Sequence, residues 1–189
     1  MDTLVTTQWL AGNLGQPDIA IVDCSAFMPA DGRDPAAEFR QAHIPGARFL
    51  DINVVSDRSN PAPHMLPSAA EFGQAMSVVG VGRDDRIIVY DNSPLRTAAR
   101  GWFMFLHFGA ERVVILDGGF QKWRAEGRPV ESGEARPRQA RFDAHARLGE
   151  VVSKEAILAG PGMPVIDARG KARFEGTEPD PRPNVGGGH

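Results

Sequence analysis

Cysteine is nearly absent from this chain of 189 residues, in which Cys24 is the only one. No disulfide can therefore form within the chain, and a zinc site that needs several cysteines is excluded. The formal net charge is only -3 and the basic residues are scattered, so the sequence gives little support to nucleic-acid binding. We expect a globular protein that is held together by its apolar core, with no metal site and no cofactor.

Long apolar runs are absent as well. No stretch approaches the roughly 20 apolar residues that a membrane-spanning helix needs, so we expect no membrane partner. Residues 1–4 show no basic segment that leads into an apolar run, and thus no visible secretory signal. These absences predict a cytoplasmic protein, although a mature form that had lost a targeting peptide would look the same.

Short apolar runs alternate with helix-forming stretches along residues 1–127. Runs without polar alternation indicate strands that are buried on both faces, and they lie at residues 19–23, 86–90 and 113–116. Helices are predicted near 7–14, 35–41, 68–79, 96–108 and after 117. Ser68 and Glu71 have the spacing of a capping box at the start of the third helix. This order predicts an α/β fold in which a central parallel sheet is covered by helices on both faces.

Features of the first part of the sequence recur near its end. Residues 21–23 (Ile-Val-Asp), 38–39 (Glu-Phe) and 43–47 (His-Ile-Pro-Gly-Ala) are echoed by 165–167 (Val-Ile-Asp), 173–174 (Arg-Phe) and 188–189 (Gly-His). Such a repeat predicts a tandem protein of two similar domains. We expect a complete domain at 1–127, a linker at 128–149, and the truncated start of a second domain at 150–189, with its first strand at 164–167.

Two motifs connect the chain to a known family. The first is Glu-Phe at 38–39 followed by His-Ile-Pro-Gly-Ala at 43–47, and the second is Asp-Gly-Gly-Phe at 117–120 followed by Trp123. With them, the chain resembles the rhodanese-like sulfurtransferases, and most of all the two-domain subgroup that acts on thiosulfate or 3-mercaptopyruvate. The resemblance implies a rhodanese-like fold in which the first domain is catalytically silent and the second carries the reactive cysteine.

One sequence position predicts that the first domain is catalytically inactive. In this family a cysteine follows a central strand, and the N–H groups of the next loop and helix stabilise its thiolate and persulfide. Here the matching strand ends at Tyr90 and the next residue is Asp91, whose carboxylate cannot carry transferable sulfur. We expect Asp91 to be a loop-stabilising hydrogen-bond acceptor. Cys24 is expected to be a small buried hydrophobe rather than a substitute nucleophile, so this chain alone should be inactive.

Two arginines in the second copy indicate a substrate. Arg173 and Arg182 stand nine positions apart, and arginines at these motif positions are similar to those that bind the carboxylate and carbonyl end of 3-mercaptopyruvate. A guanidinium fork matches a carboxylate, although two solvated loop arginines would give the same pattern. The resemblance implies transfer of sulfur from this small donor, through a cysteine persulfide, to cyanide, a small thiol or a thioredoxin-like protein. The alternatives are a thiosulfate:cyanide sulfurtransferase and a non-catalytic protein-binding module.

Three histidines occupy motif positions. In the subgroup the histidine matching His64 points into the interdomain cleft, in a proton relay with a carboxylate eleven positions earlier. That position is Asn53 here, which cannot stabilise a charged imidazole as a carboxylate would, so a cleft role and a plain loop hydrogen bond are both left open for His64. His43 and His189 share one motif position in the two copies, which favours a structural role at the turn that follows.

Overall fold

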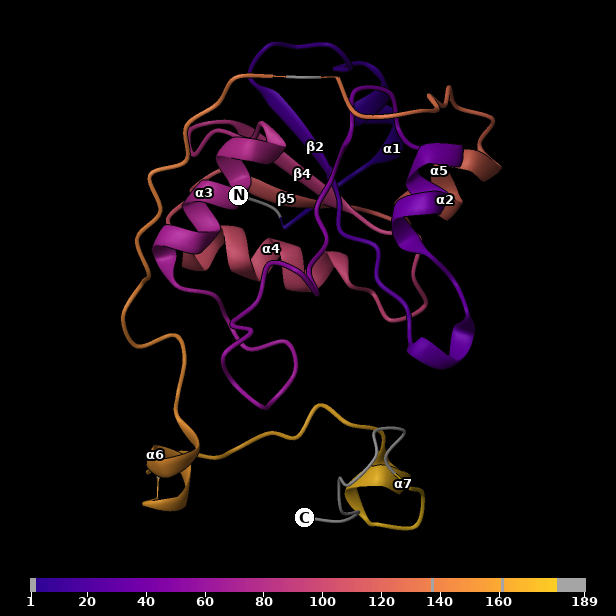
Figure 1. Ribbon diagram of the computed structural model, residues 1–189. Coiled ribbons are helices and arrows are strands. Elements are labelled where there is room, and N and C mark those ends of the chain that lie inside the picture. Colours follow the sequence, from indigo (N-terminus) through magenta and orange to yellow (C-terminus); the bar gives the residue numbers. More distant parts are fainter. Residues whose placement is uncertain (1–2, 137, 161, 180–189) are drawn as a thin grey trace. The chain divides into compact units, whose positions relative to one another are not determined.

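The computed structural model describes residues 3–136, 138–160 and 162–179, and the chain divides into two compact units, Met1–Leu148 and Gly149–His189. In the described part of the first unit, five parallel strands form one sheet in the order β1-β5-β4-β2-β3 (Figure 1). They are β1 (Leu4–Val5), β2 (Ile19–Asp23), β3 (Arg48–Phe49), β4 (Arg86–Tyr90) and β5 (Val113–Leu116). The predicted parallel sheet is confirmed. β1 was not predicted, because two residues are too few to show a period.

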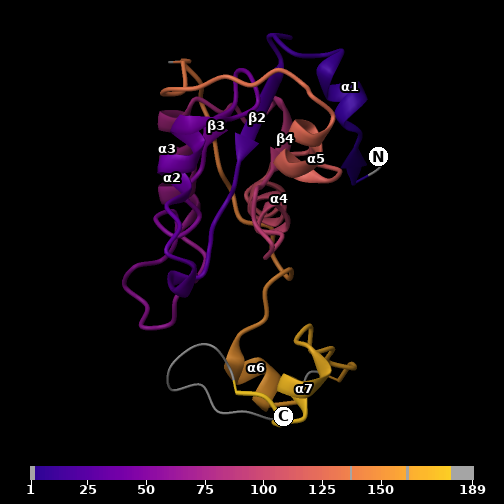
Figure 2. The same ribbon diagram turned by 90° about the vertical axis from the view of Figure 1, so that its right-hand side faces the viewer.

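Helices cover both faces of this sheet, as predicted. They are α1 (Thr7–Ala11), η1 (Pro29–Asp31), α2 (Pro35–Gln41), α3 (Ala69–Val79), α4 (Ala98–His107) and α5 (Gly119–Ala125). Successive strand side chains point to opposite faces, so Val89 packs in the core with Phe105 of α4, whereas its neighbour Ile88 packs in the core with Trp123 of α5. Figure 2 shows β3, β2 and β4 side by side between these layers.

Local signals set the helix boundaries. The Ser68 hydroxyl accepts from the N–H of Glu71 at 3.3 Å, and the Glu71 carboxylate accepts from the N–H of Ser68 at 2.8 Å. This is the predicted capping box, which satisfies two N–H groups that the helix itself leaves unpaired. Thr6 caps α1 in the same way, through a hydrogen bond from the N–H of Trp9.

Residues 128–136 and 138–148, here called the strap, pack along the first unit beside α3 (orange in Figure 1). The Phe142 side chain is only 3% exposed and meets Phe72 of α3 edge-on, with ring centroids 5.4 Å apart. The Phe142 N–H donates to the Ser77 hydroxyl at 3.1 Å. The compact unit therefore extends to Leu148, past the boundary at 127 that the sequence predicts.

Backbone and ionic contacts hold the strap in two further places. Glu131 exchanges backbone hydrogen bonds with His43 at 2.8 and 2.9 Å. Arg138 donates both guanidinium ends to the Asp85 carboxylate, each at 2.7 Å. The strap has no helical or strand period, so the sequence pattern could not predict that it packs. Its role as a linker between two domains stays a prediction.

The second unit contains two short helices in its described part, α6 (Lys154–Leu158) and α7 (Lys171–Phe174). Ser153 caps α6 as predicted. The strand predicted at 164–167 is absent, and the side chains of Val165 and Ile166 are 64% and 89% exposed. A strand needs a neighbour for its backbone N–H and C=O groups, and no described strand pairs with this segment. The prediction of a strand here is wrong.

Candidate functional site

The candidate site is the loop at 91–97, which leads from the carboxyl end of β4 into α4. Ligands of open parallel α/β sheets bind at this edge, outside the ends of the strands. The neighbouring strand β2 ends at Asp23 beside Tyr90, its partner in the register of the two strands. This is the loop in which the family resemblance places the reactive cysteine.

Both oxygens of the Asp91 carboxylate accept hydrogen bonds from backbone N–H groups of this loop and of the helix that follows it. Its Oδ2 accepts from the N–H of Ala98 at 2.6 Å, and its Oδ1 accepts from the N–H of Ser93 at 3.1 Å. Asp91 is 8% exposed, and Ala98 begins α4, whose N-terminal end favours negative charge. The expected role as a loop-stabilising acceptor is confirmed. The loop thus supplies its own anion at the place where a thiolate or persulfide would need stabilisation.

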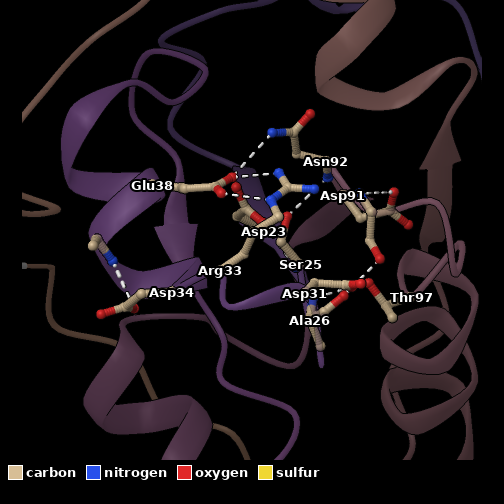
Figure 3. Close-up of polar contacts among 12 residues, drawn as sticks. Asp23, Ser25, Ala26, Asp31, Arg33, Asp34, Glu38, Asp91, Asn92 and Thr97 are labelled. Atoms are coloured by element: carbon tan, nitrogen blue, oxygen red, sulfur yellow. Dashed lines mark hydrogen bonds and ion pairs between the residues drawn. The ribbon is translucent and has the colours of Figure 1, made fainter. Parts of the chain in front are cut away.

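Hydroxyl and backbone groups tie the loop to the connection between β2 and α2 (Figure 3). The Asn92 N–H donates to the Ser25 hydroxyl at 2.8 Å, and the Ser93 hydroxyl donates to the Ala26 carbonyl at 2.6 Å. The Ala26 N–H donates in turn to the Thr97 hydroxyl at 3.2 Å. Sequence analysis missed this set of contacts, although Ser25 lies just after a strand and Thr97 just before a helix, where polar side chains gather. These contacts close the loop from both ends.

Glu38, the acid of the first motif, also holds this loop. Its carboxylate takes two hydrogen bonds from the Arg33 guanidinium, at 2.7 and 2.6 Å, and one from the Asn92 side chain at 3.3 Å. The Arg33 guanidinium lies 3.6 Å from the centre of the Phe27 ring. The hydrogen bond from Arg33 is the main cause that lowers the pKa of Glu38. About a third of both side chains is exposed, so the pair fixes geometry more than it adds stability.

Two titratable groups are buried beneath the loop. Asp23 is 4% exposed and accepts from the N–H of Ser25 at 2.8 Å, and its burial raises the pKa to about 6. Cys24 is fully buried, and its burial, followed by the charge of Asp23, raises the pKa of the thiol well above its usual value. A thiol that stays protonated is a poor nucleophile. The expectation that Cys24 is a buried hydrophobe is confirmed.

The second motif supports the loop from behind. The Phe120 N–H donates to the Asp91 carbonyl at 2.9 Å. Gly119 has a φ of 57°, and a Cβ at this position would lie 2.5 Å from the same carbonyl oxygen. Glycine is therefore required on two grounds, its left-handed backbone and its contact with the loop. Trp123, the last residue of the motif, is fully buried and donates from its indole N–H to the Pro129 carbonyl at 2.7 Å.

His43 is structural, as predicted. Its ring is 1% exposed, stacks on Phe39 with centroids 4.0 Å apart, and donates from Nδ1 to the Phe39 carbonyl at 2.7 Å. The turn that follows is held from the strap, because the Gly46 N–H donates to the Glu131 carboxylate at 2.8 Å. His189 lies outside the described residues.

His64 lies in an exposed loop and has a φ of 60°, a conformation that residues other than glycine rarely adopt. Its carbonyl accepts from the guanidinium of Arg100 on α4 at 2.7 Å. Asn53 is exposed, and its N–H donates to the Asp51 carboxylate at 2.9 Å. The relay role of the His64 imidazole stays a prediction.

Of the two arginines predicted to bind the substrate, Arg173 lies within the described residues. Arg173 lies on α7, partly buried, and its charge contributes to the low pKa of Asp167, after the larger effects of hydrogen bonds from Arg169 and opposing burial. Arg182 lies outside the described residues. The convergence of Arg173 and Arg182 on one substrate stays a prediction.

The room beside the loop is small. A cavity of about 180 Å³ lies against it, lined by Asp91, Arg96, Gly118 and Leu4 among others. Sites for small organic ligands usually enclose roughly 300–1,000 Å³. No group of three or more metal-ligating side chains was found among the described residues. The cavity beside the Asp91 loop is therefore smaller than is usual for sites that bind small organic ligands.

Replacing Asp91 by alanine should destabilise the first unit by about 2–3 kcal/mol, because two buried N–H groups lose a charged acceptor. The measurement is urea unfolding of the full chain. The matched control is Asp117→Ala, which removes the carboxylate after the next strand. That side chain is 49% exposed and pairs only with Lys122 among the contacts described, so the control should change stability by about 0.5 kcal/mol or less. Equal effects of the two substitutions would contradict the assigned role of Asp91.

No helix in the described ranges is long and apolar enough to cross a membrane. Within residues 6–126, the sequence matches the family described as the rhodanese-like domain. The chain is 40% identical to human 3-mercaptopyruvate sulfurtransferase and 38% identical to thiosulfate/3-mercaptopyruvate sulfurtransferase 1 of Arabidopsis thaliana, over 98% and 100% of its own length. It spans 66% and 56%, respectively, of the length of these two relatives.

Solved structures agree with the sequence matches. The crystal structure of SseA from Escherichia coli, described as a 3-mercaptopyruvate sulfotransferase, matches with a TM-score of 0.87 and 37% identity. The match covers 93% of this chain and 68% of that one. The Tum1 protein of Saccharomyces cerevisiae matches with a TM-score of 0.86 and 28% identity. By its sequence and by the fold of its first unit, this chain belongs to the rhodanese-like domain family.

Proposed function

We propose that this chain supplies the silent domain of a sulfurtransferase that takes sulfur from 3-mercaptopyruvate. The carrying observation is the closed Asp91 loop, in which a carboxylate and its two N–H donors fill the place of the reactive cysteine. The similarity to human 3-mercaptopyruvate sulfurtransferase over 98% of the chain supports the substrate class. In this proposal residues 128–149 connect to a second domain that begins at 150, and the reactive cysteine belongs to a part of that domain that follows residue 189.

The proposed reaction has two transfers. The cysteine thiolate of the second domain attacks the sulfur of 3-mercaptopyruvate, the carbon–sulfur bond breaks, and the enolate that leaves takes up a proton to become pyruvate. The outer sulfur of the persulfide then passes to cyanide, a small thiol or a thioredoxin-like protein, and the cysteine thiolate is restored. In this proposal Arg173 and Arg182 hold the substrate carboxylate and carbonyl, and the His64 imidazole is a candidate proton relay. Binding charge by a guanidinium fork suits this substrate.

The chain by itself should release no pyruvate from 3-mercaptopyruvate and form no persulfide on Cys24. Its thiol is fully buried and kept protonated, so it cannot reach the donor sulfur. Pyruvate is measured with a coupled assay, and persulfide by intact mass with and without a thiol-blocking reagent. Turnover comparable to that of the Escherichia coli relative, or a sulfur adduct on Cys24, would contradict the proposal.

The proposed transfer of sulfur from 3-mercaptopyruvate can be tested only with a completed second domain. Joining this chain to the remaining C-terminal part of the Escherichia coli relative should restore pyruvate release. In that chimera Arg182→Gln should lower kcat/KM for 3-mercaptopyruvate about tenfold or more, and should change thiosulfate turnover much less. Arg141→Gln is the control, since that side chain is 84% exposed on the strap. Equal losses with both donors would argue against the assigned substrate.

Thiosulfate is the second candidate donor, because the Arabidopsis relative is named for both donors and a mouse thiosulfate sulfurtransferase is 37% identical to the chain. Faster turnover of thiosulfate by the chimera would favour it. A non-catalytic binding module is supported by the closed loop alone, and a folded but inactive chimera would favour that alternative. A cytoplasmic location stays a proposal, since the same Arabidopsis relative is named as mitochondrial.

A further inference from the structure

A larger cavity lies in the first unit away from the Asp91 loop. It encloses about 430 Å³ between α2, β3, the last turn of α3 and the strap. Its lining includes four arginines, at 40, 48, 136 and 138, and one acidic residue, Glu134. Its apolar walls include Phe39, Phe49 and Val79. The proposed sulfur transfer uses none of these four guanidinium groups.

Arg48 is the buried cation of this cavity. It is 8% exposed, its Nε donates to the Gly80 carbonyl at 2.9 Å, and its Nη1 donates to the Arg136 carbonyl at 3.5 Å. Both acceptors are neutral, and no carboxylate of the described residues lies within 4.0 Å of its nitrogens. Burial, followed by the nearby charge of Arg138, lowers the pKa of Arg48, and the charge of Asp85 opposes this shift only in part. The nearby carboxylate of Asp85 is already held by two hydrogen bonds from Arg138. Among the described residues Arg48 therefore has no carboxylate in direct contact, and an anion would be stabilised here.

The rim of the cavity carries two arginines that are weakly held. Arg40 meets Glu134 only at 3.9 Å, and these side chains are 47% and 81% exposed. Arg136 pairs with Glu131 at 2.7 Å but is itself 81% exposed. Exposed pairs of this kind are worth little, so both guanidinium groups are available to a stronger anionic partner. Arg138, in contrast, is fixed by its two hydrogen bonds to Asp85.

A structural role explains only part of this arrangement. The bond from Arg48 to Gly80 caps the C-terminal end of α3, where a cation is favourable. That role needs one guanidinium, and it accounts neither for the rim arginines nor for the space. The volume lies within the roughly 300–1,000 Å³ that is usual for small organic ligands, and a bare oxyanion would leave the apolar walls without contacts.

We propose that this cavity binds a small organic anion, with its charged group on Arg48 and the rim arginines and an aromatic or branched apolar body against Phe39 and Phe49. The shared chemistry is that of a phosphate or carboxylate carried by such a body. The site is separate from the proposed sulfur transfer and stands or falls independently of it.

Calorimetric titration of the full chain tests this proposal with three probes: phenyl phosphate, inorganic phosphate and phenol. Phenyl phosphate should bind more tightly than the other two, since it alone offers both the charge and the ring. Its addition should shift the backbone amide NMR signals of β3 and of the last turn of α3. The double variant R40Q/R136Q should weaken phenyl phosphate binding about tenfold or more.

The double variant changes exposed side chains, so it should keep the urea midpoint of the native chain. R141Q, which removes an arginine of the strap outside the cavity lining, is the matched control and should bind like the native chain. Lack of phenyl phosphate binding at millimolar concentration would overturn the proposal. So would equal binding of inorganic phosphate, an unchanged affinity in the double variant, or shifts confined to other parts of the chain.

Discussion

Replacing Gly119 by alanine is expected to destabilise the first unit by about 3 kcal/mol or more, from backbone strain and overpacking together. The backbone at this position has a φ of 57°, and the added Cβ would lie 2.5 Å from the Asp91 carbonyl oxygen. That oxygen belongs to the backbone and also accepts from Phe120, so it cannot move without disturbing the loop. Urea unfolding followed by circular dichroism measures the loss.

Gly127 provides the control for this substitution. Its φ is 66°, and no atom lies within 4 Å of the position that a Cβ would take. Gly127→Ala should therefore cost only the strain of a left-handed backbone, about 1–2 kcal/mol. The difference between the two variants reports the contact with the Asp91 loop. An equal loss of unfolding free energy in the two variants would show that this contact does not contribute to stability.

Replacing Asp23 by asparagine should stabilise the chain at neutral pH, by about 3 kcal/mol at most. Burial raises the pKa of this carboxyl from 3.8 to about 6 in the folded chain. Above that pH the folded state must hold a buried carboxylate, whereas the unfolded state holds a solvated one. Asparagine stays neutral and still offers an oxygen to the N–H of Ser25, which donates to Asp23 at 2.8 Å.

The pH dependence gives this prediction its sign. As the pH falls from about 6 to about 4, the folded state binds a proton that the unfolded state does not yet bind, so the free energy of unfolding of the native chain rises. The advantage of Asp23→Asn should therefore be greatest above pH 6 and vanish below about pH 4. Urea unfolding of both proteins across this range measures the difference directly.

Asp18 provides a control of opposite sign. Its hydrogen bond and ion pair with Arg86 lower its pKa below the usual value, so its ionised form stabilises the folded chain. Asp18→Asn should lower stability at neutral pH, and this loss should disappear as the pH falls below the pKa of the carboxyl. A loss of stability at neutral pH from Asp23→Asn would contradict the assigned burial of Asp23, and a gain from Asp18→Asn would contradict the stabilising ion pair with Arg86.

The parts of the fold that were predicted are those with local signals. The strands at 19–23 and 86–90 were predicted because a parallel sheet buries both faces, and α3 because Ser68 and Glu71 mark its first turn. The strap gave no such signal, because its packing depends on single anchors such as Phe142. The strand expected at 164–167 failed for the opposite reason, since an apolar run forms a strand only when a neighbour pairs with it.

Some features of the candidate site could likewise be predicted from the sequence, and others could not. The sequence shows Asp91 at the position where the family resemblance expects a cysteine, and it also indicates that a carboxylate there cannot carry transferable sulfur. The contacts that close the loop join Ser25 and Ala26 to residues about seventy positions later, so they arise only when β2 and β4 lie side by side. The burial of Arg48 without a carboxylate in direct contact among the described residues was equally hidden, because an arginine in sequence gives no sign of its exposure.

The closed loop at 91–97 also bears on how this domain could change over evolutionary time. A single substitution of Asp91 by cysteine would introduce a thiol but would leave the hydroxyl groups of Ser25, Ser93 and Thr97 bonded as they are. The new thiol would meet a backbone shaped around two carboxylate oxygens. If this domain is silent as proposed, a return to catalysis would therefore require more than this one substitution.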